Sequence, residues 1–156
     1  MSVNPDYKEL LSVFNEEGVE YLVVGAHAVI FYTVPRYTKD IDLWVNPTAE
    51  NAARVYRALA KFGSPLEGTD VASFQDANCL FQIGVEPNRA DVLMGVAGLV
   101  FEEAWSRRAR GSYGGVPINI LSLSDLIRSK EAVGRAQDMV DVQRLRKAKP
   151  LTGGES

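Results

Sequence analysis

Two aspartates separated by one apolar residue are the clearest chemical signal in the sequence. Asp40 and Asp42 lie in a run that alternates charged and apolar residues, with Ile41 and Leu43 as its apolar members. If the run is a strand, side chains two residues apart share one face and lie roughly 6–7 Å apart. Two like charges on one face repel each other, and a folded protein keeps them most readily where a cation lies between them. The pair therefore predicts a metal-binding face.

The residues before this pair predict the elements that position it. Tyr21–Val24 is a short apolar run, which indicates a buried strand, and Gly25 marks a tight turn after it. Residues 26–32 then predict a short helix that Pro35 prevents from continuing, and residues 40–45 predict the second strand. Backbone N–H groups at the start of such a helix can bind an anion. The stretch thus combines a candidate cation site with a candidate phosphate site.

This order of residues resembles the core signature of the nucleotidyltransferase superfamily. In that family a Gly-Gly or Gly-Ser turn and a helix precede an Asp-x-Asp strand, as Gly25 precedes Asp40 and Asp42 here. Ala26 stands where the family has the second Gly or Ser, so a hydroxyl contact to phosphate is absent. The resemblance extends from residue 21 to residue 145. It implies an α/β (α+β-like) nucleotidyltransferase fold, with a small mixed β-sheet flanked by helices.

Arg36 and Thr38 precede the aspartates at alternate positions, and this version of the motif resembles the small bacterial members related to abortive-infection (AbiEii-like) toxins. The resemblance implies that Gly25, Ala26, Arg36 and Thr38 contact the nucleotide phosphates. Arginine suits this role because it can make bidentate contacts. The alternative for Arg36 is a structural ion pair with Asp40.

The resemblance also implies a reaction, a cofactor and partners. The reaction moves a nucleoside monophosphate from a nucleoside triphosphate to a hydroxyl group, and pyrophosphate leaves. Mg²⁺ or Mn²⁺ would be held by Asp40, Asp42 and Asp91, as in two-metal sites with ions about 3.5–4 Å apart. The acceptor stays open among an RNA end, a protein hydroxyl and a small molecule. A homodimer or a partner protein could help to bind it, because little of the chain remains for a second domain.

Asp91 is the third carboxylate in this hypothesis. It begins an apolar run after a predicted hairpin turn, so the sheet would fix its direction. In the resembled family, a third carboxylate on a neighbouring strand completes the metal site and can activate the attacking hydroxyl. A strand-end aspartate in solvent is the alternative, and we favour the functional interpretation because of the Asp40 and Asp42 pair.

The C-terminal part contains further charged candidates. Lys130, Asp138 and Asp141 resemble the lysine and the Lys-Asp-x-x-Asp motif of the toxin-related members, with Gln137 in place of the second lysine. Lys130 could neutralise a triphosphate oxygen as a point charge, or it could belong to a solvated charged face. For Arg135, Asp138 and Asp141 we favour a solvated face with local ion pairs. His27, the only histidine, could donate a hydrogen bond to a nucleotide as a neutral imidazole, but we favour packing or capping.

Composition predicts one globular domain. The chain has 156 residues and a net charge of −3, which weakly disfavours a dedicated nucleic-acid binder. It contains no apolar run of about eighteen residues, and its start lacks the apolar segment of a signal peptide. The single cysteine, Cys79, excludes an internal disulfide and fits the cytoplasm. We expect one domain over residues 1–149 and a disordered tail over residues 150–156.

The remaining chain predicts alternating helices and strands. Expected helices are a first one from Pro5 that Gly18 ends, one after Thr48 that Gly63 ends, Phe101–Arg110, and a last helical region from Ser122 or Ser124 to about Lys147. Expected strands are Leu80–Val85 and Ala90–Met94, joined as a hairpin, and Val116–Leu121. The polar residues 64–78 predict a loop.

Two other functions stay open. Ala26 and Gln137 depart from the family pattern, which favours a catalytically degenerate member that acts as an antitoxin or a partner-binding subunit. Paired aspartates alone also occur in metal-dependent phosphatases and nucleases, but the order Gly25, helix, Asp40 and Asp42 argues against that class.

Overall fold

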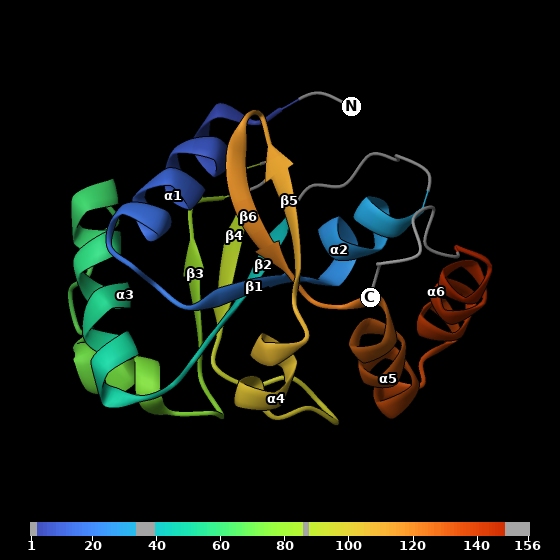
Figure 1. The fold of residues 1–156 in the computed structure, drawn as a ribbon. Coiled ribbons are helices and arrows are strands. Elements are labelled where there is room, and N and C mark those ends of the chain that lie inside the picture. Colours follow the sequence, from blue (N-terminus) through green and yellow to red (C-terminus); the bar gives the residue numbers. More distant parts are fainter. Residues whose placement is uncertain (1–2, 34–39, 86–87, 149–156) are drawn as a thin grey trace.

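The computed structural model describes residues 3–33, 40–85 and 88–148, which form a mixed α/β structure (Figure 1). Its helices are α1 (Pro5–Glu16), α2 (Gly25–Tyr32), α3 (Ala49–Phe62), the short 3₁₀ helix η1 (Val71–Gln75), α4 (Phe101–Ser106), α5 (Leu123–Val133) and α6 (Ala136–Lys147). Its strands are β1 (Tyr21–Val24), β2 (Ile41–Val45), β3 (Leu80–Ile83), β4 (Ala90–Leu93), β5 (Ala109–Tyr113) and β6 (Val116–Ile120).

The strands form one six-stranded mixed sheet in the order β3-β4-β2-β1-β6-β5. β2 is antiparallel to β1 and parallel to β4, and β1 is parallel to β6. The outer strands belong to the antiparallel hairpins β3–β4 and β5–β6. The central strands are apolar because both sides of the sheet are covered, and β1 is buried at all of its positions. This sheet places β2 and β4 next to each other although they are far apart in the sequence.

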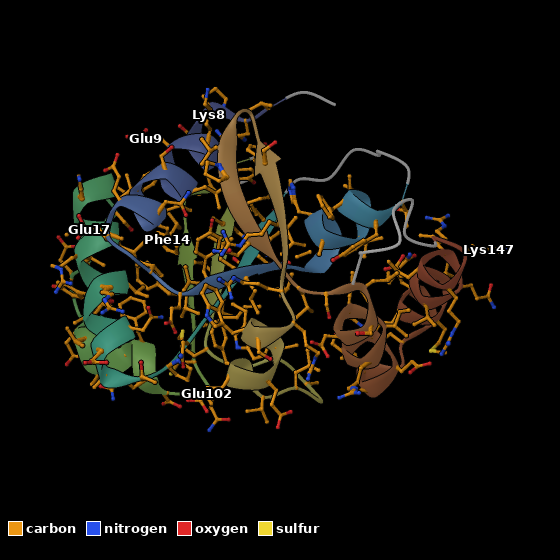
Figure 2. All side chains as sticks on the ribbon, viewed as in Figure 1. Lys8, Glu9, Phe14, Glu17, Glu102 and Lys147 are labelled. Carbon is orange, nitrogen blue, oxygen red and sulfur yellow. The ribbon has the colours of Figure 1, made fainter. Side chains whose placement is uncertain are left out.

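Helices cover the sheet from different sides. In Figure 1, α1 and α3 pack side by side at the left, while α2, α5 and α6 lie together at the right and α4 lies below the sheet. Figure 2 shows Phe14 pointing from α1 toward the sheet, where its ring meets that of Tyr21 on β1 at 5.8 Å between centroids. On β2, the ring of Trp44 meets that of Phe101 on α4 at 5.0 Å.

The expected helix starts and ends are largely confirmed. The side chains of Asn4, Thr48 and Ser122 accept hydrogen bonds from the first-turn amides of α1, α3 and α5. Gly63 ends α3 in the left-handed conformation. Among the described residues, no helix combines the length and the apolarity needed to cross a membrane.

The predicted helix Phe101–Arg110 is wrong in its second half. α4 ends at Ser106, and the next residues form the edge strand β5. Directly after the helix, the guanidinium of Arg107 binds both carboxylate oxygens of Asp125, at 2.9 and 3.0 Å. Gly114 and Gly115 both have positive φ values, 58° and 89°, as a two-residue hairpin turn requires.

Two further expectations needed correction. The last helical region is divided into α5 and α6, because Gly134 adopts the left-handed conformation and ends α5. The predicted loop over residues 64–78 contains η1, which buries Phe74 completely. The ring of Phe74 lies against that of Phe81, at 5.4 Å.

Candidate functional site

The parallel pairing of β2 and β4 brings two of the three predicted carboxylates side by side. Asp42 and Asp91 are direct partners in the register of the two strands, and partners in a register point to the same face of a sheet. Asp40 comes immediately before β2, on the same side as Asp42 by strand alternation. The structure therefore places all three carboxylates around the start of these two strands.

The turn after β1 is pressed against Asp42. Gly25 has a φ of 68°, and a Cβ atom added to it would lie 2.3 Å from the Oδ2 atom of Asp42. Only glycine fits here, because it tolerates positive φ and brings no side chain. The first turn of α2, whose N–H groups have no partner within the helix, thus begins beside the carboxylates.

The surroundings of Asp42 disfavour the charged form of its carboxylate. Burial, together with the nearby carboxylates of Asp91 and Asp40, raises the pKa of Asp42 from 3.8 to about 6. The positive charges of Arg89 and Lys130 act in the opposite direction. Metal-free Asp42 is therefore in an environment that disfavours its charge, which is what an added cation would relieve.

Arg89 lies among the carboxylates. Its Nη2 atom is 3.0 Å from Oδ2 of Asp40 and 3.2 Å from Oδ2 of Asp91. The backbone of Arg89 is held in place, because its carbonyl accepts hydrogen bonds from the Ile41 amide at 3.3 Å and the Tyr7 hydroxyl at 2.8 Å. The sequence analysis did not single out Arg89. The available signal was its position two residues before Asp91, which puts both side chains on one face of the strand.

Lys130 is held by a buried acidic pair. Its ammonium group lies 3.4 Å from Asp138 and 3.1 Å from Asp141. The two aspartates are only 1% and 2% exposed, so the expectation of a solvated charged face is wrong for them, while the expectation of ion pairs is confirmed. Arg135 hydrogen-bonds to Asp138 and lowers its pKa to about 2. Gln137 donates a hydrogen bond to Asp141 at 3.0 Å.

His27 serves packing, as expected. Burial lowers its pKa to about 4, so the imidazole is neutral at pH 7. Its ring makes edge contacts with Tyr7 on α1 and Tyr113 on β5, at 5.8 and 6.2 Å between centroids.

The donor chemistry of the site fits a hard cation. Carboxylate oxygens are the ligands that Mg²⁺ and Mn²⁺ prefer, and the Oδ1 atom of Asp91 is buried with no hydrogen-bond partner. Within the described ranges, no group of three His, Cys, Asp or Glu side chains is arranged to hold a metal ion. Two of the carboxylates are instead bridged by Arg89.

Of the other predicted phosphate-binding residues, only some can be placed. Gly25 and Ala26 form the start of α2, beside the carboxylates. Arg36 and Thr38 lie outside the described residues.

Comparisons with solved structures identify the fold. The lincosamide antibiotic adenylyltransferase LnuA, solved with lincomycin bound, superposes with a TM-score of 0.60 at 15% identity, over 96% of this chain and all of its own. A "putative nucleotidyltransferase" from Thermotoga maritima gives a TM-score of 0.61 at 13% identity, over 95% and 97% of the two chains. The antibiotic-resistance factor ANT(2'')-Ia gives 0.61 at 15% identity, over 91% and 81%.

By sequence alone, no protein-family model and no curated protein matches the chain. The structural likenesses nevertheless establish that the chain has the nucleotidyltransferase fold. The match covers at least 81% of each neighbour.

Proposed function

We propose, on the premise of this fold, that the protein transfers a nucleoside monophosphate from a nucleoside triphosphate to a hydroxyl acceptor, with Mg²⁺ or Mn²⁺ as cofactor. The observation that carries the proposal is the contact between Gly25 and Asp42 beside Asp91. It sets a helix start that can bind phosphate directly against a group of carboxylates that can bind a cation. Nucleotidyl transfer needs these two features next to each other.

Each site residue that the structure describes has a proposed role that its position supports. Asp40, Asp42 and Asp91 would hold the divalent cation, which would supply charge neutralisation at the triphosphate and a lowered pKa of the acceptor hydroxyl. The amides of Gly25 and Ala26 would bind phosphate oxygens. Lys130 is close enough to lower the Asp42 pKa, and its charge would favour the triphosphate on that side. Arg36 and Thr38 complete the proposed phosphate-binding set.

The chemical step follows from these roles. The acceptor oxygen attacks the α-phosphorus, the bond from that phosphorus to the bridging oxygen breaks, and pyrophosphate leaves with the bonding electrons. Asp91 would accept the proton of the acceptor hydroxyl, because its buried Oδ1 atom makes no hydrogen bond and because it lies beside Asp42.

The acceptor stays open among RNA, protein and small molecules. Two solved neighbours contain small antibiotics, lincomycin in LnuA and adenylyl-2''-tobramycin in ANT(2'')-Ia. These names favour a small hydroxylated molecule as the first acceptor class to examine. The resemblance to abortive-infection toxins instead favours a macromolecular acceptor in the bacterial cytoplasm. A homodimer or a partner protein would then help to bind it.

A second candidate function is a catalytically degenerate subunit that binds a partner, such as an antitoxin. The ion pairs of Arg89 with Asp40 and Asp91 favour it, because a protein without metal would keep such carboxylates neutralised by its own side chains. Ala26 and Gln137 are compatible with the same interpretation. Nucleotide binding separates the two candidates.

Calorimetry with the four ribonucleoside triphosphates, in Mg²⁺ and in chelator, tests the proposal. We expect at least one triphosphate to bind in Mg²⁺, and binding to be lost in chelator and in Asp42→Asn. Glu67→Gln is the control, because Glu67 is an exposed carboxylate away from the site. Binding of equal strength in chelator would refute the metal requirement, and no binding under any condition would favour the degenerate subunit.

A further inference from the structure

We propose that Arg89 is a built-in counter-ion of the metal-free site, that a divalent cation displaces it, and that its guanidinium then binds the triphosphate. This inference rests on the proposed function and assigns a further residue to the same site. It concerns a side chain to which neither the sequence motifs nor the comparisons give a role.

The geometry is the first argument. One atom, Nη2 of Arg89, contacts one oxygen of Asp40 at 3.0 Å and one oxygen of Asp91 at 3.2 Å. A cation shared by these same two oxygens would have to lie in the space that Nη2 occupies. A guanidinium and a divalent ion cannot share that space, and their charges repel each other strongly at such short distances. Metal binding therefore requires the head of Arg89 to leave.

The burial of the residues is the second argument. The Arg89 side chain is 32% exposed, whereas that of Asp91 is 11% exposed, so Arg89 is the more accessible partner of this ion pair. Its backbone stays fixed, because its carbonyl accepts hydrogen bonds from the Ile41 amide and the Tyr7 hydroxyl. The long side chain can therefore change rotamer while the strand and the carboxylates keep their positions.

The distribution of charge is the third argument. Lys130, a second described cation whose charge acts on Asp42, already contacts the buried carboxylates of Asp138 and Asp141, which offset its charge. When a metal ion takes the place of Arg89 at the carboxylates, the guanidinium loses these contacts. Phosphate oxygens of the bound triphosphate can then replace them. Guanidinium binds phosphate in a bidentate manner, which an ammonium group cannot do. Arg89 would thus oppose metal alone and favour metal together with triphosphate.

Arg89→Gln tests this pair of opposite effects. Binding of Mn²⁺ alone, measured by electron paramagnetic resonance, should become about tenfold tighter, the effect of removing one competing charge. Binding of the best ribonucleoside triphosphate with Mg²⁺, measured by calorimetry, should become about tenfold weaker, because one charged contact is lost. Arg144→Gln, at an exposed position of α6, is the matched control and should change neither affinity.

Arg89→Lys keeps the positive charge and serves as a second test if Arg89→Gln does not fold. Its affinity for Mn²⁺ alone should stay within about twofold of the wild type, while triphosphate binding should weaken severalfold because the bidentate contact is lost. The inference is overturned if Arg89→Gln binds Mn²⁺ no more tightly than the wild type, or if both variants bind the triphosphate as the wild type does. If the inference fails in either way but the wild type still binds the triphosphate with Mg²⁺, the proposed function is unaffected. A wild type that binds neither Mn²⁺ nor triphosphate refutes both.

Discussion

Among single residues, Gly25 and Asp42 are under the tightest constraint. The carboxylate of Asp42 occupies the place where any side chain at residue 25 would begin, and the glycine has a positive φ. Gly25 thus allows the turn after β1 and also leaves room for the carboxylate of Asp42. Gly25 begins α2 directly after β1, and Asp42 lies on β2. The contact between the two residues therefore depends on the pairing of β1 with β2, which sets Val24 opposite Asp42.

Gly25→Ala should destabilise the protein by about 2–4 kcal/mol, because strain at positive φ adds to overpacking against Asp42. Gly18→Ala is the matched control, since Gly18 has nearly the same φ, 71°, but nothing within 4 Å of the added atom. It should cost only about 1 kcal/mol, the strain alone. Urea denaturation measures both. Equal losses in the two variants would show that the contact with Asp42 has no energetic weight.

Asp42→Asn should stabilise the metal-free protein above pH 6 by about 1–3 kcal/mol. The folded-state pKa is about 6, above the usual 3.8, so the folded state holds the Asp42 proton more tightly than the unfolded state. Below pH 3.8 the group is neutral in both states and costs nothing. As the pH rises through this interval, ionisation destabilises the wild type but not the variant.

Thermal unfolding of the two proteins in chelator, from pH 4 to pH 8, measures this difference. Their melting temperatures should coincide near pH 4 and separate by pH 7, with the variant higher. Glu67→Gln should follow the wild type throughout. A variant that melts below the wild type at pH 7 would instead identify Asp42 as a partner in a stabilising ion pair.

Among the elements, α5 and α6 are linked by ion pairs. Lys130 near the end of α5 contacts Asp138 and Asp141, which α6 presents from two successive turns. Both aspartates are almost fully buried, and Arg135 together with this lysine favours the charged form of Asp138 and so lowers its pKa. The arrangement holds Lys130 at a defined position next to the carboxylate face.

Lys130→Met should destabilise the protein by about 2–4 kcal/mol, because two buried carboxylates lose one of the cations that stabilise their charge. Lys147→Met, at an exposed position near the end of α6, is the control and should have little effect. Amide hydrogen exchange should show the loss concentrated in α6. A change of less than about 1 kcal/mol would mean that the pairs are no stronger than surface ion pairs.

The sequence predicted most of the helices and strands, and the predictions that were wrong have physical causes. Residues 109–113, Ala-Arg-Gly-Ser-Tyr, alternate between the two faces of β5, but the small Ala109 and Gly111 on the inner face make a weak strand signal. The division between α5 and α6 depends on Gly134, and a glycine within a helical pattern does not by itself show that the helix ends. The 3₁₀ helix η1 lies in a polar segment, and the packing of its Phe74 against Phe81 on the following strand β3 leaves no helical or strand periodicity in the sequence.

For the whole molecule, the fold decides which chemical residues meet. The sequence predicted a common face for Asp40 and Asp42 from their spacing, and Asp91 could join them only if two distant strands were neighbours. The parallel pairing of β2 and β4 supplies that condition. The bridge that Arg89 makes was not predicted, because it depends on the register of the two strands and not on a motif. The roles of these residues in catalysis remain predictions.

Transfer of label from the α-phosphate of a triphosphate tests the account most directly. The protein would be incubated with α-labelled and, separately, γ-labelled triphosphates, Mg²⁺ or Mn²⁺, and fractions of small molecules, RNA and protein as acceptors. We predict that label from the α position enters an acceptor, that the γ label leaves as pyrophosphate, and that Asp91→Asn abolishes transfer while triphosphate binding persists. Transfer of the γ label, release of orthophosphate, or undiminished transfer by Asp91→Asn would contradict the account.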